Sequence, residues 1–360
     1  MTMLARLRVA STALRRQPRL RRTLLVLVAL VAVGLCAFGV AEVWSTAGPE
    51  LAHARLVDVA LALLATASYY LIFVLGWIAI LAAWGLPVSY RVALQSEMVS
   101  MLAKYVPGGV WTPAARVAAF ERLSGVEETG AVLASILIEA VLSALAGVAV
   151  FVLSLAWVRH VDAPLLPLAL FVAACLALLH PRVFRPLMLR VLKPFGLREL
   201  EPLPLGTLTG LFPFYCLTWL IGGLGLYFLL RGVGAPPRLE TIPFLGGTAA
   251  IGAIVAVLAV FAPSGLGARE ASMYALLIAV ASPSAALAAT ILNRLTITVV
   301  ELALFLVGVA LWRREGLRSQ GDRPPSLRGR GREREATAPH EAGSEAAAFS
   351  RRGRFGTRRA

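Results

Sequence analysis

Residues 130–157 read GAVLASILIEAVLSALAGVAVFVLSLAW, a run of apolar residues interrupted by a single ionisable side chain, Glu139. At about 1.5 Å of rise per helical residue, such a run is long enough to cross a hydrocarbon core about 30 Å thick. Five more apolar runs occur, at residues 23–44, 57–84, 164–179, 207–230 and 284–311. The sequence therefore predicts an all-α polytopic membrane protein with six full spans.

The composition supports helices in lipid with charge outside it. Apolar residues make up 58% of the chain and the mean hydropathy is +0.77, yet the formal net charge is +15. A soluble interior does not explain both values, whereas apolar spans joined by basic loops do. The three cysteines and four histidines are scattered, without the spacing of a metal site. We therefore expect no metal and no cofactor.

Basic residues set the expected orientation, because loops rich in Lys and Arg stay in the cytoplasm. Residues 1–22 carry seven Arg, and the loops 85–129 and 180–206 carry four and five basic residues. The loops 45–56 and 158–163 carry one Arg each. We expect the first three segments in the cytoplasm and the last two outside a bacterial inner membrane.

The chain is expected to contain a single folded part. Residues 23–312 should form the transmembrane domain, preceded by the basic cytoplasmic segment 1–22. Residues 313–360 are rich in Arg, Glu, Gly and Pro and poor in large apolar side chains, so a disordered cytoplasmic tail is expected. With both termini inside, the number of membrane crossings must be even.

Two regions of the chain fit no clean span. Each has a short apolar helix, a Pro-x-Gly break and a second short helix with an Arg near its start. The helices are predicted at 91–104 and 111–123 and at 241–262 and 269–281. The breaks contain Pro107, Gly108 and Gly109 in the first region and Pro263, Ser264, Gly265 and Gly267 in the second.

These two regions predict an internal repeat. By the orientation above, the first enters from the cytoplasm and the second from outside, as in the inverted repeats of transporters. We favour six full spans plus two inverted re-entrant helical hairpins, because a helix at 91–104 reaches only about 21 Å and one at 271–281 about 16 Å, although a helix at 241–262 would reach about 33 Å. The alternatives are eight crossings, in which 241–262 and 269–281 each span, and ordinary loops at the membrane surface.

Ionisable residues inside the apolar runs are candidate site residues, because charge at membrane depth is costly without a partner or a water path. Glu139, Arg294 and Glu301 lie within predicted spans. Arg294 and Glu301 share one helical face but are separated by about 10.5 Å of rise, too far to pair directly. Further candidates flank the breaks: Lys104, Tyr105, Arg116, Arg269 and Glu270. Interhelix pairing that only fixes packing is the alternative role.

Three segments carry a family resemblance: KYVPGGVW at 104–111, PSGLGARE at 263–270 and NRLT at 293–296. They resemble signature segments of the lysylphosphatidylglycerol synthase transmembrane family, which is flippase-like, and the resemblance covers roughly residues 20–312. Two positions depart from the family pattern. Ser264 stands where Gly is more usual, and Ala268 stands where a β-branched residue is common.

The resemblance implies a function in lipid movement. The family's best-understood members flip an aminoacylated phospholipid between leaflets, and a separate soluble domain performs the aminoacyl transfer. The sequence shows only a short tail in place of that domain, so we expect no enzymatic activity and assign no catalytic residues. The implied cargo is an anionic or aminoacylated phospholipid or a polyprenyl-phosphate-linked lipid. The headgroup path would be lined by Lys104, Tyr105, Arg116, Glu139, Arg269, Glu270, Arg294 and Glu301.

In this path the cations are expected to meet phosphate, and the carboxylates to balance charge or contact an amine. Two alternatives remain open: a membrane-embedded transferase for lipid-linked substrates, and a non-catalytic partner of a separately encoded glycosyltransferase. Self-association is a further expectation, whereas nucleic-acid binding is not expected because the Arg-rich tail lacks interleaved aromatic residues.

Overall fold

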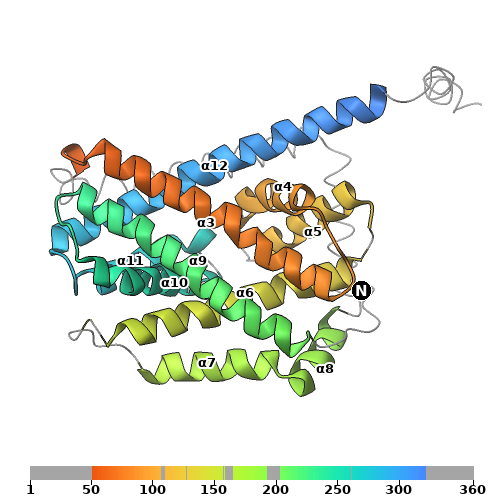
Figure 1. Ribbon diagram of the computed structural model, residues 1–360, viewed down its shortest axis with the longest axis horizontal. Helices are drawn as coiled ribbons and strands as arrows, with labels where there is room; N and C mark the ends of the chain where they lie inside the picture. The colour runs from red at the N-terminus through yellow and green to blue at the C-terminus, as the bar shows by residue number, and fades with distance from the viewer. Residues whose placement is uncertain are drawn as a thin grey trace, which may run out of the picture. The chain divides into compact units, whose positions relative to one another are not determined.

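The computed structural model describes residues 51–106, 110–126, 128–156, 158, 165–192, 203–260 and 262–321, and their regular structure is entirely helical (Figure 1). The first of two compact units, Met1–Val309, contains all of these helices except the end of α12. The α-helices are α3 (Leu56–Ala83), α4 (Tyr90–Ser100), α5 (Trp111–Ser124), α6 (Thr129–Ser154), α7 (Leu165–Leu179), α8 (Pro181–Leu192), α9 (Leu205–Gly232), α10 (Ile242–Leu258), α11 (Ala268–Leu277) and α12 (Pro283–Gly321), and the 3₁₀ turns are η1 (Met101–Tyr105), η3 (Leu239–Thr241) and η4 (Pro263–Gly265).

Five described helices are long and apolar enough to cross a membrane: α3, α6, α9, the segment Leu239–Leu258 and the segment Pro283–Trp312. The chain is therefore a multi-pass membrane protein, as predicted. The predicted span 164–179 forms α7, whose 15 residues rise only about 22 Å and fall short of the core thickness. The predicted span 23–44 lies outside the described residues.

Several segments differ from the prediction. Helices α10 and α11 end at Leu258 and Leu277 rather than at 262 and 281. The helix predicted at 91–104 ends at Ser100, and a 3₁₀ turn continues to Tyr105. The segment 180–206 was predicted as a loop from its basic residues, but it contains the helix α8. Helix α12 continues beyond Trp312 to Gly321, because the Arg, Glu, Leu and Gln residues there propagate an existing helix readily.

Helices α3 and α9 each precede one of the two helical hairpins, have 28 residues each and pack side by side (Figure 1). Asp58, near the start of α3, accepts a 2.7 Å hydrogen bond from Nε of Arg231 at the end of α9. Gly76, near the end of α3, packs against Tyr215 in the first half of α9. The two helices therefore run antiparallel, which is the arrangement that an inverted repeat requires.

Each helical hairpin starts and ends at one end of this pair. Trp77 in the last turns of α3 donates a 2.8 Å hydrogen bond to Ser135 at the start of α6, so hairpin α4–α5 returns to the end it left. Val233 after α9 packs with Ala285 and Ala288 at the start of α12, so hairpin α10–α11 does the same at the opposite end. In Figure 1 the two hairpins accordingly gather at opposite ends of α3.

The two hairpins meet where η1, which precedes the first break, contacts η4 of the second break. Within each hairpin the two helices pack together: α4 on α5, and α10 on α11. Gly265 closes the second hairpin, because it has φ of +68° and a Cβ there would overlap Ala256 of α10. Ser264 also has a positive φ, +52°, which favours glycine. Pro107, Gly108 and Gly109 of the first break lie outside the described residues.

The second break predicts opposite effects for two neighbouring substitutions. Ser264→Gly should leave the thermal transition in detergent unchanged or raise it, because it relieves a left-handed non-glycine residue that costs about 1–2 kcal/mol. Gly265→Ala should lower the transition, since it adds a Cβ that overlaps Ala256 and about 1–3 kcal/mol of backbone strain. Equal transitions for the two variants would contradict this account of the break.

Candidate functional site

Glu301 of α12 is the centre of a polar cluster near the contact between η1 and η4. Its carboxylate forms an ion pair with Lys104 of η1 and accepts a hydrogen bond from the Tyr70 hydroxyl of α3. The Tyr105 hydroxyl donates to the other carboxylate oxygen at 3.3 Å. The Glu301 side chain is only 1% exposed, whereas that of Lys104 is 27% exposed. The cation therefore keeps an accessible face.

Arg294, two turns earlier on α12, connects this cluster to the second hairpin. Its Nη1 lies 3.4 Å from the Glu270 carboxylate and donates a 3.2 Å hydrogen bond to the Ser264 carbonyl oxygen. The guanidinium also lies 5.8 Å from the ring centre of Tyr105. Glu270 in turn accepts a 2.7 Å hydrogen bond from the backbone N–H of Gly267, so one carboxylate caps α11 and faces Arg294.

Arg269 differs from the other cations of the region. Among the described residues its guanidinium forms no ion pair, and its buried Nε has no hydrogen-bond partner. Its charge lies near Tyr69, Tyr70 and Lys104, at the edge of the cluster around Glu301. A buried guanidinium donor without a partner is costly, and an anionic ligand would satisfy it.

Arg116 and Glu139 belong to a second, closed cluster. Arg116 lies 2.6 Å from Glu139 and 2.8 Å from Glu97, and its guanidinium stacks 3.8 Å from the ring centre of Trp77. The Arg116 and Glu139 side chains are 7% and 3% exposed. These ion pairs neutralise the charge of Arg116 within the protein. The cluster is therefore better suited to holding α4, α5 and α6 together than to binding a ligand.

The repeat places an ion pair at equivalent points in its two halves. In the first, Arg116 of α5 pairs with Glu139 of the following long helix, α6. In the second, Glu270 of α11 pairs with Arg294 of the following long helix, α12. The signs are reversed, and only the second pair adjoins an accessible cation. The same scaffold thus provides one closed pair and one open pair.

The open cluster lies beside the middle of α3. Tyr70, which contacts Glu301, is about 21 Å along α3 from Leu56, half of that helix's length. At this depth charged groups normally pair with each other or line an aqueous cavity. Helices α5 and α11 both begin at the breaks, so their N-terminal N–H groups and positive dipole ends lie near the cluster.

The structure therefore divides the eight predicted site residues. It brings together Lys104, Tyr105, Arg269, Glu270, Arg294 and Glu301, and it places Arg116 and Glu139 in the closed cluster. Arg294 and Glu301 pair with other residues rather than with each other, as predicted. The sequence reasoning missed Glu97, Tyr70 and Trp77. Two sequence features could have indicated site residues. Glu97 is a carboxylate in a short predicted helix, and Tyr70 is a tyrosine in the middle of a predicted span.

The formal charge of the open cluster is suited to a monoanionic group. Lys104, Arg269 and Arg294 contribute +3 and Glu270 and Glu301 contribute −2, which leaves +1. The donor set of guanidinium, ammonium and helix N-termini matches phosphate oxygens. No group of three His, Cys, Asp or Glu residues that could hold a metal ion occurs in the described part of the chain.

The two clusters predict different stability effects for two arginines. Arg116→Met should lower the thermal transition strongly, because it leaves two buried carboxylates unpaired at about 3–5 kcal/mol. Arg269→Met should leave the transition unchanged or raise it, since it removes a buried donor without a partner among the described residues. The comparison requires thermal unfolding of both variants in one detergent. A larger loss for Arg269→Met would contradict the division into closed and open clusters.

Comparison with known proteins identifies a family for the helical part of the chain. No curated protein matches the chain. A family model, the lysylphosphatidylglycerol synthase TM region, matches residues 22–304. The match includes both hairpins, both charged clusters and the part of α12 that carries Arg294 and Glu301. The chain therefore belongs to the family of the lysylphosphatidylglycerol synthase TM region, of which it contains the membrane module.

Proposed function

We propose that the protein is a lipid translocator, which moves a charged phospholipid or a polyprenyl-phosphate-linked lipid between the leaflets. One observation carries this proposal: three cations and two half-helix N-termini converge at half depth, and one of the cations, Arg269, has no ion-pair partner among the described residues. A membrane protein holds such a group at that depth for a ligand that is itself charged.

The headgroup is proposed to bind between the two breaks. Its phosphate would receive donors from Arg269 and Lys104, and Arg294 would contribute its unbonded Nη2. Glu270 and Glu301 would balance the charge, or contact the amine of an aminoacylated headgroup. The ion pairs Lys104–Glu301 and Arg294–Glu270 keep these cations neutralised before the lipid arrives, and the hydrocarbon tails remain in the bilayer.

The proposal includes the re-entrant topology. Each hairpin leaves and returns to one end of the bundle, and irregular backbone at membrane depth is tolerated where protein or a cavity surrounds it. Both termini would be cytoplasmic, in a bacterial inner membrane. We assign no chemical step to the chain, and a separately encoded transferase is its proposed partner.

Lipid movement can be measured in proteoliposomes of phosphatidylcholine with a trace of fluorescent phosphatidylglycerol, by chemical quenching of the outer leaflet. Arg269→Met should slow movement at least about tenfold, the equivalent of one lost charge-assisted hydrogen bond. Arg269→Lys should retain part of the rate. Arg238→Met removes an exposed cation outside the cluster and serves as the matched control. Two results would count against the proposal: lipid movement in wild-type vesicles no faster than in protein-free vesicles, or an unchanged rate of movement for Arg269→Met.

The topology can be tested with single cysteines in a chain whose Cys36, Cys175 and Cys216 are replaced by serine. With a membrane-impermeant maleimide, Val126→Cys should react from the cytoplasmic side and Arg238→Cys from the outside. Val260→Cys, at the tip of the second hairpin, should resist the cytoplasmic reagent. Reaction of Val260→Cys as fast as Val126→Cys would favour eight crossings.

A further inference from the structure

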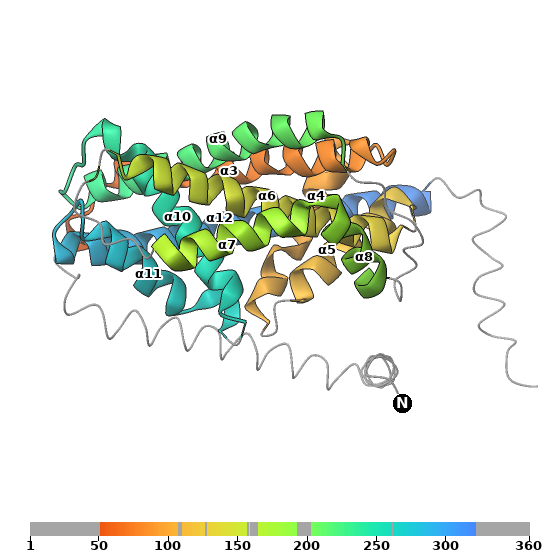
Figure 2. The same ribbon diagram turned by 90° about the horizontal axis from the view of Figure 1, so that it is seen from below.

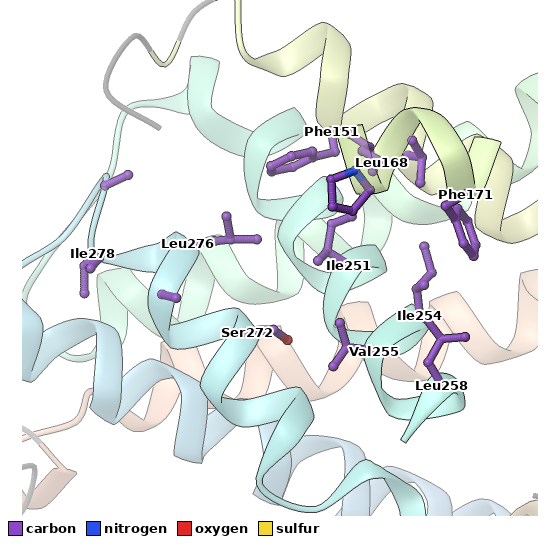
Figure 3. Close-up of a pocket in the computed structure, with 14 residues that line it drawn as sticks. Phe151, Leu168, Phe171, Ile251, Ile254, Val255, Leu258, Ser272, Leu276 and Ile278 are labelled. Atoms are coloured by element: carbon purple, nitrogen blue, oxygen red, sulfur yellow. The ribbon is translucent and has the colours of Figure 1, made fainter. Parts of the chain in front are cut away.

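An apolar pocket of about 660 Å³ lies beside the second hairpin, between α6, α7, α10 and α11 (Figure 3). Its volume is in the range of ligand-binding pockets, about 300–1,000 Å³. Phe151 of α6 and Phe171 of α7 contribute aromatic walls, and Ile251 and Val255 of α10 and Leu276 of α11 contribute aliphatic ones. No function considered so far uses this pocket.

The pocket offers its occupant almost no hydrogen bonds. Ser272 is the one polar side chain among the described residues that line it, and its hydroxyl already donates a 2.9 Å hydrogen bond to the Arg269 carbonyl oxygen. Water in such a pocket lacks the two to four polar partners that it needs. A hydrocarbon chain, by contrast, gains about 0.8 kcal/mol per buried methylene.

Helix α7 leaves the pocket accessible from the lipid. It lies at the edge of the bundle beside α6, and the described helices on which it packs are α6 and α8 (Figure 2). Leu258 of α10 and Ile278 after α11 both line the pocket and are 65% and 47% exposed, so its rim reaches the surface of the described helices. A chain can therefore enter from the bilayer without first crossing water.

The pocket also adjoins the open cluster through α11. Ser272 lies one helical turn after Arg269, so the pocket wall and the unpaired guanidinium belong to the same stretch of helix. The Arg269 stem packs on Gly252, 3.5 Å from the place of a Cβ there, next to the pocket residue Ile251. A headgroup at Arg269 would thus have its own hydrocarbon within reach of the pocket.

We infer that this pocket binds one acyl or isoprenoid chain of the transported lipid while the headgroup occupies the open cluster. The inference rests on the proposed translocator function and deepens it. It assigns recognition of the hydrocarbon chain to α7 and the second hairpin. The protein would then recognise both the headgroup and the hydrocarbon chain of the lipid. The cargo class is then a lipid with a monoanionic headgroup and a long, flexible hydrocarbon chain.

The test uses phosphatidylglycerol with a photoreactive diazirine in the middle of one acyl chain, in proteoliposomes of the full chain. Cross-linked peptides should concentrate at residues 251–258 and 272–279. Ala275→Trp and Ile254→Trp each place a large side chain in the pocket and should lower cross-linking there about tenfold, as expected for the loss of a few buried methylenes. Leu217→Trp, on the exposed face of α9 outside the pocket, should not.

The same variants are then measured for movement of fluorescent phosphatidylglycerol, with thermal transitions to confirm folding. Slower movement in both pocket variants, together with an unchanged rate for Leu217→Trp, would support the inference. Cross-links spread evenly over lipid-facing helices, or wild-type movement with the pocket filled, would overturn it. Specific cross-links in the pocket with no movement in wild-type vesicles would instead refute the translocator function and leave a lipid-binding site.

Discussion

The rest of the structure depends on one constraint, the cost of a charge or an open backbone group at the depth where lipid offers no hydrogen bonds. The chain satisfies this constraint by bringing its irregular segments together. The 3₁₀ turns η1 and η4 contact each other, and the ionisable residues around them pair across helices. Helices α3 and α9 form the antiparallel pair against which both hairpins are positioned, and α12 supplies a partner to each hairpin.

The two hairpins have similar local arrangements, yet one contains a closed ion-pair cluster and the other a candidate binding site. In each half, the helix after the break is tied to the next long helix by an ion pair. The first pair is enclosed by Glu97 and Trp77, and its contacts hold α4, α5 and α6 together. The second adjoins Lys104 and Arg269, whose charge exceeds what the local carboxylates neutralise. This asymmetry between equivalent positions is the strongest structural reason to place a ligand in the second half.

Much of this organisation could be predicted from the sequence, because each signal was local. Apolar length indicated the spans that form α3, α6, α9 and α12. The two Pro-x-Gly breaks indicated the pairs of short helices, α4 with α5 and α10 with α11. The pairing partners could not be predicted in the same way. Lys104 and Glu301 are 197 residues apart, and neither position indicates the other without the fold. Likewise, Arg116 and Arg269 each follow a Pro-x-Gly break. Only the packing of Glu97 and Trp77 shows that Arg116 is buried in ion pairs, whereas Arg269 has no ion-pair partner among the described residues.

The central claim, that the open cluster holds a charged headgroup, is tested most directly by native mass spectrometry of the lipids retained by the purified protein. Delipidated protein would be offered an equimolar mixture of phosphatidylglycerol and phosphatidylcholine, which differ in net headgroup charge. A cluster of formal charge +1 predicts preferential retention of phosphatidylglycerol by the wild type and loss of that preference in Arg269→Met. Equal retention of both lipids by the wild type, or the same preference in the variant, would contradict the claim.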